Sequence, residues 1–242
     1  LSLVVRHTAA EPGCTLELPK RATAMRASPA DTQEPKRVTK QTKQKSSVAF
    51  RNKLRSSILE VGRRLIANEG LSSIQARRIA TEADCSVGSI YNVFEDLDDL
   101  IIALNMLTLD ELGSSLQMAH EEARQQATHD RLLALAFAYF TFASEHQKPW
   151  RAIFEHQLPE GRATPPEYRD DQDKLFALVE ECLANDLTED EQRKSAARAL
   201  FASVHGIVSL SLYRKLGEFE PVATRRQIEF LVGCTARGLQ RT

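Results

Sequence analysis

Residues 70–100 restrict the fold of this chain more than any other stretch, because two short helical patterns meet there at a tight break. In the first pattern, over about 75–83, Ile79, Ala80 and Ala83 recur at the spacing that places side chains on one face of a helix. Arg77 and Arg78 then point away from this apolar face. This part of the stretch therefore predicts a short helix with one apolar face.

A break and a second helix follow directly. Residues 84–86 interrupt the pattern, and the hydroxyl of Ser86 is well suited to accept a hydrogen bond from a free amide of the next helix. That helix is predicted over about 87–94, where Ile90 and Phe94, four residues apart, pack inward. The sequence thus predicts two helices joined by a tight turn.

The outer side of the second helix carries small or hydrogen-bonding side chains and almost no charge. Such a surface fits closely into the major groove of DNA, where residues near a helix N-terminus reach base edges and hydroxyls or amides reach phosphates. An ordinary helical hairpin with a tyrosine in its core has the same geometry, so the helix pair alone leaves both interpretations open. The outward residues are Val87, Gly88, Ser89, Tyr91 and Asn92.

A longer pattern distinguishes the two interpretations. From residue 58 to 100 the chain reads ILEVGRRLIANEG, then RRIATEADCSVGSIYNVF, then DLDDLI. This ordered run resembles the DNA-binding domain of TetR-family transcriptional regulators. The resemblance implies that the second helix reads the major groove, with Arg77 at a base edge and Tyr91 and Asn92 at phosphates. The residues expected to contact DNA are Arg51, Gln75, Arg77, Ser86, Val87, Gly88, Ser89, Tyr91 and Asn92.

The chain departs from the family pattern at two positions. The family commonly has Ser or Thr where this chain has Gln75, to cap the first helix and bond a phosphate. The family also often places a Lys at the start of the following helix, whereas this chain has an acidic run from Glu95 to Asp99. Since acid repels phosphate, we expect these carboxylates to turn away from DNA and this corner to contribute little affinity.

A basic helix is predicted in front of the pair, from Ser47 to the C-cap at Gly70. Between Lys36 and Arg64 the chain has ten basic residues and one acid, although its net charge is −1. A basic segment beside such a helix pair favours attraction to the phosphate backbone, and a solvated tail is the alternative. The apolar stripe of this helix is Phe50, Leu54, Ile58, Val61 and Leu65.

Residues 1–46 contain four prolines among Ser, Thr, Gln and Lys and show no helical period. Such a composition predicts a disordered basic leader. The chain opens on Leu1 and its first methionine is Met25, so one hypothesis is that part of this leader is a mis-assigned or non-ATG start.

The rest of the chain shows helical patterns and no strand pattern. Asp96 is expected to cap a long helix, and Thr188 with Glu191 has the spacing of a capping box. The expected fold class is all-α: a three-helix helix-turn-helix domain over 47–95, then a roughly six-helix ligand-binding and dimerisation domain over 96–242. The later helices are expected at about 97–123, 130–146, from Pro149, 170–184, from Thr188 to Lys215, and 223–239.

Two shorter patterns, PWRAIFEH from Pro149 and FASVHGIVSL from Phe201, resemble a TetR subgroup whose C-terminal domain has a His-Gly-containing helix. The family implies a small-molecule effector and a homodimer formed by the last two helices. Closure of the chain's own core is the alternative role for these helices. The small residues that would let them approach a second copy are Ala196, Ala199, Ala202, Ser203, Gly206, Gly233 and Ala236.

Aromatic residues with a few polar atoms are the usual lining of a small-molecule cavity. Ordinary core is the alternative for each of them, and the family resemblance implies only that part of the core is hollow. The effector chemistry is not readable here, and a largely apolar or aromatic compound is the default. The predicted pocket residues are Phe137, Phe140, His146, Trp150, Phe154, Phe176 and His205, with Tyr139 and Phe142 beside them.

No pattern in the chain predicts catalysis, a metal site or a cofactor. The motifs H-E-x-x-H, G-x-S-x-G, the P-loop and G-x-G-x-x-G do not occur, and the four cysteines are scattered. No early apolar run fits a signal peptide, and the longest apolar run is shorter than the roughly 20 residues of a membrane helix. We therefore expect a cytoplasmic protein that is not an enzyme.

Together these observations predict a ligand-responsive transcriptional regulator. We expect a repressor, because repression is the common role in the family. It would bind a pseudo-palindromic operator in double-stranded DNA as a homodimer and leave it when a small-molecule effector binds. The alternatives are an architectural or activating DNA-binding protein without a ligand, and a small-molecule enzyme built on a helical bundle.

Overall fold

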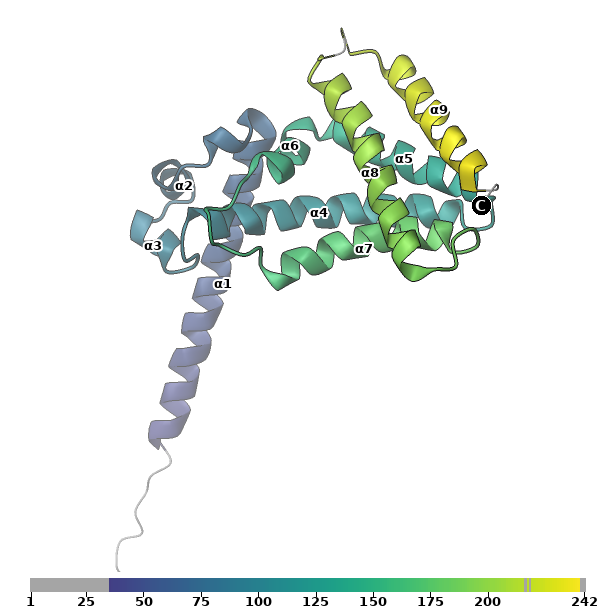
Figure 1. The fold of residues 1–242 in the computed structure, drawn as a ribbon. Helices are drawn as coiled ribbons and strands as arrows, with labels where there is room; N and C mark the ends of the chain where they lie inside the picture. Colours follow the sequence, from purple (N-terminus) through teal and green to yellow (C-terminus); the bar gives the residue numbers. More distant parts are fainter. Residues whose placement is uncertain (1–34, 216, 218, 240–242) are drawn as a thin grey trace, which may run out of the picture. The chain divides into compact units, whose positions relative to one another are not determined.

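The computed structural model describes residues 35–215, 217 and 219–239, and every regular element in this part of the chain is a helix (Figure 1). The all-α class is therefore confirmed. The described residues from Ser46 onward form one compact unit. The disordered leader predicted over 1–46 is wrong for residues 35–46, which are helical. Its remaining part and the hypothesis about the start at Met25 fall outside the described residues.

The first helix, α1, spans Pro35–Glu69 and so begins well before the predicted start at Ser47. The prediction was wrong because it relied on the apolar stripe. Lys, Arg and Gln form helices well without one, and Pro is favoured as the first helical residue. The C-terminal end lies where predicted, and the Gly70 amide bonds the Ile66 carbonyl at 2.8 Å. Gly70 has φ +89° and ψ −178°, a conformation that favours glycine but differs from the predicted left-handed C-cap.

Three short elements follow α1: a 3₁₀ turn at Leu71–Ser73, then α2 at Ala76–Glu82 and α3 at Val87–Tyr91. Helix α3 is shorter than predicted, because the amides of Val93 and Phe94 both bond the Ile90 carbonyl at 2.9 Å and close a turn. The inward residues are as predicted, since Ile79 and Ile90 are fully buried. The first core also contains Ile58, Val61, Leu65, Phe94, Leu100 and Leu104.

Helix α4, Leu97–Glu122, contributes to two cores. Its start is as predicted, because the Asp96 carboxylate accepts a hydrogen bond from the Asp99 amide at 2.9 Å. Leu104 lies in the first core against α1, where a Cβ on Gly62 would come within 2.7 Å of the Leu104 side chain. The glycine therefore allows the close approach of α1 and α4. Farther along, Leu112 and Leu116 of α4 belong to the second core.

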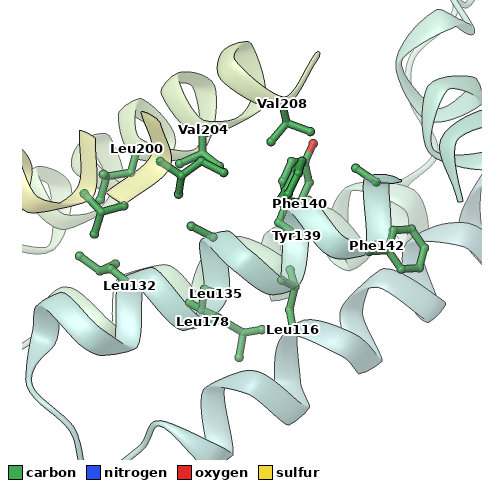
Figure 2. Close-up of a cluster of buried hydrophobic side chains, with 14 of the residues drawn as sticks. Leu116, Leu132, Leu135, Tyr139, Phe140, Phe142, Leu178, Leu200, Val204 and Val208 are labelled. Carbon is green, nitrogen blue, oxygen red and sulfur yellow. The ribbon is translucent and has the colours of Figure 1, made fainter. Parts of the chain in front are cut away.

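Five helices complete the bundle: α5 at Thr128–Glu145, α6 at Gln147–Glu155, α7 at Pro166–Leu183, α8 at Asp190–Leu212 and α9 at Pro221–Leu239. Helix α4 packs against α5, α6 and α7, while α8 packs against α7 and α9. Figure 2 shows the second core, in which Leu200 and Val204 of α8 face Leu132 of α5.

Two predicted helix starts need correction. Helix α7 begins at Pro166 rather than near residue 170, with proline again at a helix start. The capping box does not form, because α8 begins at Asp190 and its N-cap is Glu189 without a side-chain hydrogen bond. Arg193 instead bonds the Leu187 carbonyl at 2.9 Å and Asp190 at 2.8 Å. These contacts join the loop before α8 to its first turn, but they do not accept from the free amides there as a capping hydroxyl would.

By length and composition, α8 is apolar enough to cross a membrane, a test that the core helix of a soluble protein also passes. Its buried residues, which include Leu200, Val204 and Val208, belong to the second core. The packing of this face accounts for part of the apolar composition of the helix.

Candidate functional site

The turn between α2 and α3 is held by local hydrogen bonds. Asp84 adopts a left-handed conformation with φ +50°, which a short polar side chain tolerates better than most. The Cys85 amide then bonds the Ala80 carbonyl at 2.9 Å. The Ser86 hydroxyl accepts from the Ser89 amide at 3.1 Å, which confirms the predicted N-cap, and it also bonds the Ser89 hydroxyl at 2.8 Å. The direction of α3 is therefore set by its own sequence.

The outer face of α3 is accessible and carries no formal charge. Tyr91 is 47% exposed, and no hydrogen bond among the described residues engages its hydroxyl. Gly88 and Asn92 are exposed, whereas Val87 and Ser89 are half-buried. An added Cβ on Gly88 would meet only the Ser86 hydroxyl, at 3.7 Å, so its open space faces outward. This face could approach a groove closely.

The two adjacent arginines of α2 have different roles. Arg78 is held by Glu69 at 2.5 Å and by Glu82 at 3.0 Å, and these carboxylates raise the pKa of its guanidinium, Glu69 most strongly. Arg77 is exposed, and its side chain makes no ion pair or hydrogen bond within the described part of the chain. Arg77, the predicted DNA contact, thus remains available, whereas Arg78 joins α1 to α2.

The other predicted DNA-contacting residues also lie on the surface. Arg51 on α1 is exposed, and the guanidinium of nearby Arg55 lies 5.4 Å from the ring centre of Phe94. Gln75 is the N-cap of α2 but forms no capping side-chain hydrogen bond, so the departure from Ser or Thr removes that cap. Its contact with phosphate stays a prediction.

The acidic run before α4 faces the loop between α6 and α7. Arg162 of that loop contacts Asp96 and Asp99 at 2.5 Å each and Asp98 at 3.7 Å. His156 contacts Asp98 at 2.9 Å. We call Arg162, His156 and the three aspartates the loop clamp. It gives the acidic residues at the start of α4 a partner within the chain, since Arg162 offsets part of their negative charge.

A backbone hydrogen bond and nearby opposite charges shift pKa values within the loop clamp. The pKa of Asp96 lies below its ordinary value, chiefly because the Asp99 amide donates to it and also because Arg162 lies beside it. The pKa of Arg162 is raised, mainly by Asp96. Sequence reasoning missed Arg162, because more than sixty residues separate it from its partners and no periodic pattern links them.

A cavity of about 130 Å³ lies within the second core. Its walls come from α4, α5, α7 and α8, with contributions from α6 and α9. In Figure 2, Leu132 and Tyr139 of α5 lie toward α8, whereas Leu135 lies beside Leu178 and Leu116. The lining is Leu109, Leu112, Leu116, Leu132, Leu135, Ala136, Tyr139, Ile153, Phe154, Gln172, Leu175, Phe176, Val179, Leu200, Phe201, Val204 and Val232.

The predicted pocket residues divide into two groups. Phe154 and Phe176 line the cavity, as does Tyr139. Phe137, Phe140, His146, Trp150 and His205 do not.

The five residues off the lining lie elsewhere in the second domain. The Arg225 guanidinium lies 4.8 Å from the Phe137 ring centre and 5.6 Å from that of Phe140. His146 is exposed and stacks on Phe142 at 4.7 Å. An aromatic composition indicates apolar surface, but it does not say which face of a buried helix meets the cavity.

Trp150 and His205 support the cavity wall from behind Tyr139. The Trp150 indole N–H donates to the Tyr139 hydroxyl at 2.9 Å, and this hydroxyl lies 2.7 Å from Nδ1 of His205. With its oxygen accepting from Trp150, the hydroxyl donates its proton to His205. Burial lowers the pKa of His205 and raises that of Tyr139, so both groups are held neutral.

A buried amide joins α4 to α6. Asn105 is 1% exposed, and its side-chain N–H donates to the Ala152 carbonyl at 3.2 Å. Its carbonyl oxygen has no hydrogen-bond partner among the described residues. Leaving a buried polar atom unpaired costs stability, and such sites in native proteins often have a functional cause.

The outer faces of α8 and α9 expose large apolar side chains. Leu210, Val222 and Phe230 are all exposed, Phe230 to 73%. Among the small residues predicted for a dimer surface, Ala199, Ala202 and Ser203 are exposed, whereas Gly233 and Ala236 are buried within the chain's own core. Each helix thus has one face in the core and one exposed face.

One cysteine lies in the second core. Cys182 is fully buried, and burial raises the pKa of its thiol to about 11, which suppresses the reactive thiolate. Within the described residues, no group of three or more His, Cys, Asp or Glu side chains could hold a metal ion.

Known families match both parts of the chain. Residues 58–104 match the bacterial regulatory proteins of the tetR family, and residues 132–234 match the tetracyclin repressor-like C-terminal domain. An uncharacterized HTH-type transcriptional regulator of Mycobacterium tuberculosis is 28% identical over 196 residues, which cover 81% of this chain and 86% of the relative.

Solved structures share the fold. A Rhodococcus protein of unknown function is similar with a TM-score of 0.63 and 23% identity, over 76% of this chain and 94% of that one. The transcriptional regulator FadR of Bacillus subtilis, solved with stearoyl-CoA, is similar with a TM-score of 0.53 and 16% identity, over 73% and 96%.

A helix-turn-helix with an accessible second helix, a hollow helical bundle behind it and both family matches lead to one conclusion. The chain belongs to the TetR family of transcriptional regulators, which are non-enzymatic DNA-binding proteins that respond to ligands.

Proposed function

We propose that this protein is a repressor that binds a pseudo-palindromic operator as a homodimer and leaves it when a small molecule enters the cavity. In the proposed complex, the two copies of α3 lie in successive major grooves, about 34 Å apart. Tyr91 and Asn92 contact phosphates, and Arg77 reaches a base edge. The protein acts in the cytoplasm, where its DNA lies.

The position of α6 carries the proposal. Ile153 and Phe154 of this helix line the cavity, whereas the adjacent Ala152 is fully buried in the first core. The Ala152 carbonyl also accepts the hydrogen bond from Asn105 of α4. A ligand that moves Ile153 therefore acts within one residue of a contact to the helix that follows α3.

The loop clamp provides a second connection. It joins the loop after α6 to the first turn of α4, just beyond α3. A ligand acts on DNA binding only through its different affinity for two states of the protein. We propose that these states differ in the position of α6 and its loop against α4.

The exposed apolar faces of α8 and α9 support the homodimer. Large exposed apolar side chains that gather on one surface mark interaction sites in soluble proteins. Leu210, Val222 and Phe230 would pack against their symmetry mates, and Ala199 and Ala202 would allow close approach of the helices.

Light scattering and operator selection together test the proposal. The full chain should have the mass of a dimer at micromolar concentration, and selection from random DNA should yield a two-fold symmetric site with half-sites about one helical turn apart. Phe230→Glu should produce monomers and lose operator binding, whereas Met118→Glu, also at an exposed apolar residue, should do neither. A monomeric wild type that selects an asymmetric site would contradict the proposal.

Removing Arg162 should weaken operator binding in a salt-dependent way. Arg162→Gln leaves three aspartates without their cation at the start of α4, where they repel phosphate. We expect roughly a tenfold loss of affinity at 50 mM salt and a smaller one at 200 mM, measured by fluorescence anisotropy on the selected operator.

Arg169→Gln is the matched control for this prediction. It removes the same charge from an exposed arginine whose side chain makes no ion pair among the described residues. An equal loss of affinity in both variants would show that net charge alone, rather than the clamp, is responsible.

A further inference from the structure

The size of the cavity limits its ligand. Its volume is about 130 Å³. An engineered protein cavity of about 150 Å³ lined by Leu, Ile and Phe stays dry and binds benzene or xenon. The present cavity therefore accommodates a body the size of one aromatic ring without rearrangement.

The lining carries no charged side chain among the described residues. The nearby guanidinium of Arg198 lies 5.1 Å from the ring centre of Phe176 and is 3.7 Å from Asp173, so it already has partners. An ion moved from water to an apolar site without a counter-charge suffers a large desolvation penalty. The cavity therefore disfavours both carboxylates and ammonium ions.

Gln172 is the polar group of the lining that remains available. The other one, the Tyr139 hydroxyl, is engaged by Trp150 and His205. No hydrogen bond among the described residues engages the Gln172 amide, which lies on α7 one turn before Phe176 and is half-buried. An amide both donates and accepts, so it suits a hydroxyl or carbonyl group of a ligand.

We propose that the effector is a neutral, mainly apolar compound the size of a single ring, with one hydrogen-bonding group that meets Gln172. This inference rests on the proposed function, because it names the ligand class of the same cavity. An acyl-CoA, such as the stearoyl-CoA bound by FadR, has a longer chain than this volume holds. The uncharged lining also offers no partner for its phosphates.

Four probes of similar size and different charge test the ligand class: toluene, benzyl alcohol, benzoate and benzylammonium. Each is added to the full chain at pH 7, and its dissociation constant is measured by calorimetry, with thermal unfolding as a second readout. Toluene and benzyl alcohol should bind, and at ten times its Kd a probe should raise the Tm by roughly 3 to 6 °C. Benzoate and benzylammonium should give no shift at the same concentration.

Two variants locate the binding. Ala136→Leu adds carbon atoms to the lining and should abolish binding of both neutral probes. Gln172→Leu should weaken benzyl alcohol about fivefold and leave toluene unchanged, since only the alcohol uses the amide. Gln227→Leu, an exposed glutamine of α9 outside the cavity, is the control and should change neither.

The outcomes separate this inference from the proposed function. Benzoate binding as tightly as benzyl alcohol, no binding by any of the four probes, or binding that survives Ala136→Leu would each overturn the ligand class. Operator binding is measured on the same preparations. Failure to bind DNA, or neutral probes that occupy the cavity without releasing DNA, would overturn the proposed regulation and leave the ligand class standing.

Discussion

Replacing Tyr91 by Phe should weaken binding to the selected operator by about 30-fold. Each hydroxyl–phosphate hydrogen bond is worth about 1 kcal/mol, and a dimer carries two copies. The hydroxyl has no hydrogen bond among the described residues, so the free energy of unfolding should change by less than about 0.5 kcal/mol. Fluorescence anisotropy and urea denaturation measure the two quantities separately.

Tyr213→Phe is the matched control for this variant. The Tyr213 hydroxyl bonds Glu155 at 3.2 Å and its ring lies under Arg151, far along the chain from α3. Its loss should leave operator affinity unchanged. Wild-type affinity in Tyr91→Phe would show that the Tyr91 ring packs against DNA or protein without using its hydroxyl.

Replacing Trp150 by Ala should lower the free energy of unfolding by about 3 to 5 kcal/mol. Trp150 is 1% exposed, packs against Tyr139, Phe154 and His205, and donates to the Tyr139 hydroxyl. For a unit of this size the loss corresponds to a fall in Tm of roughly 10 °C. The large effect follows because this one buried side chain packs α6 against α5 and α8, through Tyr139 and His205.

Trp150→Phe separates the two contributions of the indole. It keeps an aromatic ring and removes the N–H, while the Tyr139 hydroxyl can still bond His205. We expect a loss of about 1 to 2 kcal/mol, well below that of the alanine variant. Urea denaturation gives both values. A loss below about 1 kcal/mol in Trp150→Ala would mean that the site collapses around the missing ring and that Trp150 does not hold the cavity wall.

Local features of the chain were largely predictable. Ser86 and Asp96 cap their helices as expected, and Ile90 lies in the first core, because caps and helix faces depend on residues within one or two turns. The capping box at Thr188 failed for a related reason. The spacing of its residues is correct, but a start one residue later moves the threonine out of the capping position.

The sequence predicted an apolar, aromatic cavity lining but not which residues form it. Of the seven predicted residues only Phe154 and Phe176 line the cavity, and Phe201, which also lines it, is absent from the prediction. Helix α5 is apolar on nearly every side, so its period does not separate the cavity face from the face toward α9. Much of the lining is aliphatic, and leucines in a cavity wall have the same sequence pattern as leucines in a packed core.

By itself the sequence determined the helical class, the order of the helices, the caps of α3 and α4 and the uncharged outer face of α3. Only the tertiary structure decided which of two adjacent arginines remains available, that Arg162 pairs with the aspartates at the start of α4, and that the lining of the cavity carries no charged side chain among the described residues. The physical reason is distance along the chain. Helix propensity and capping act between neighbours, whereas ion pairs such as Arg162 with Asp96, and cavities among four helices, exist only after distant segments pack together.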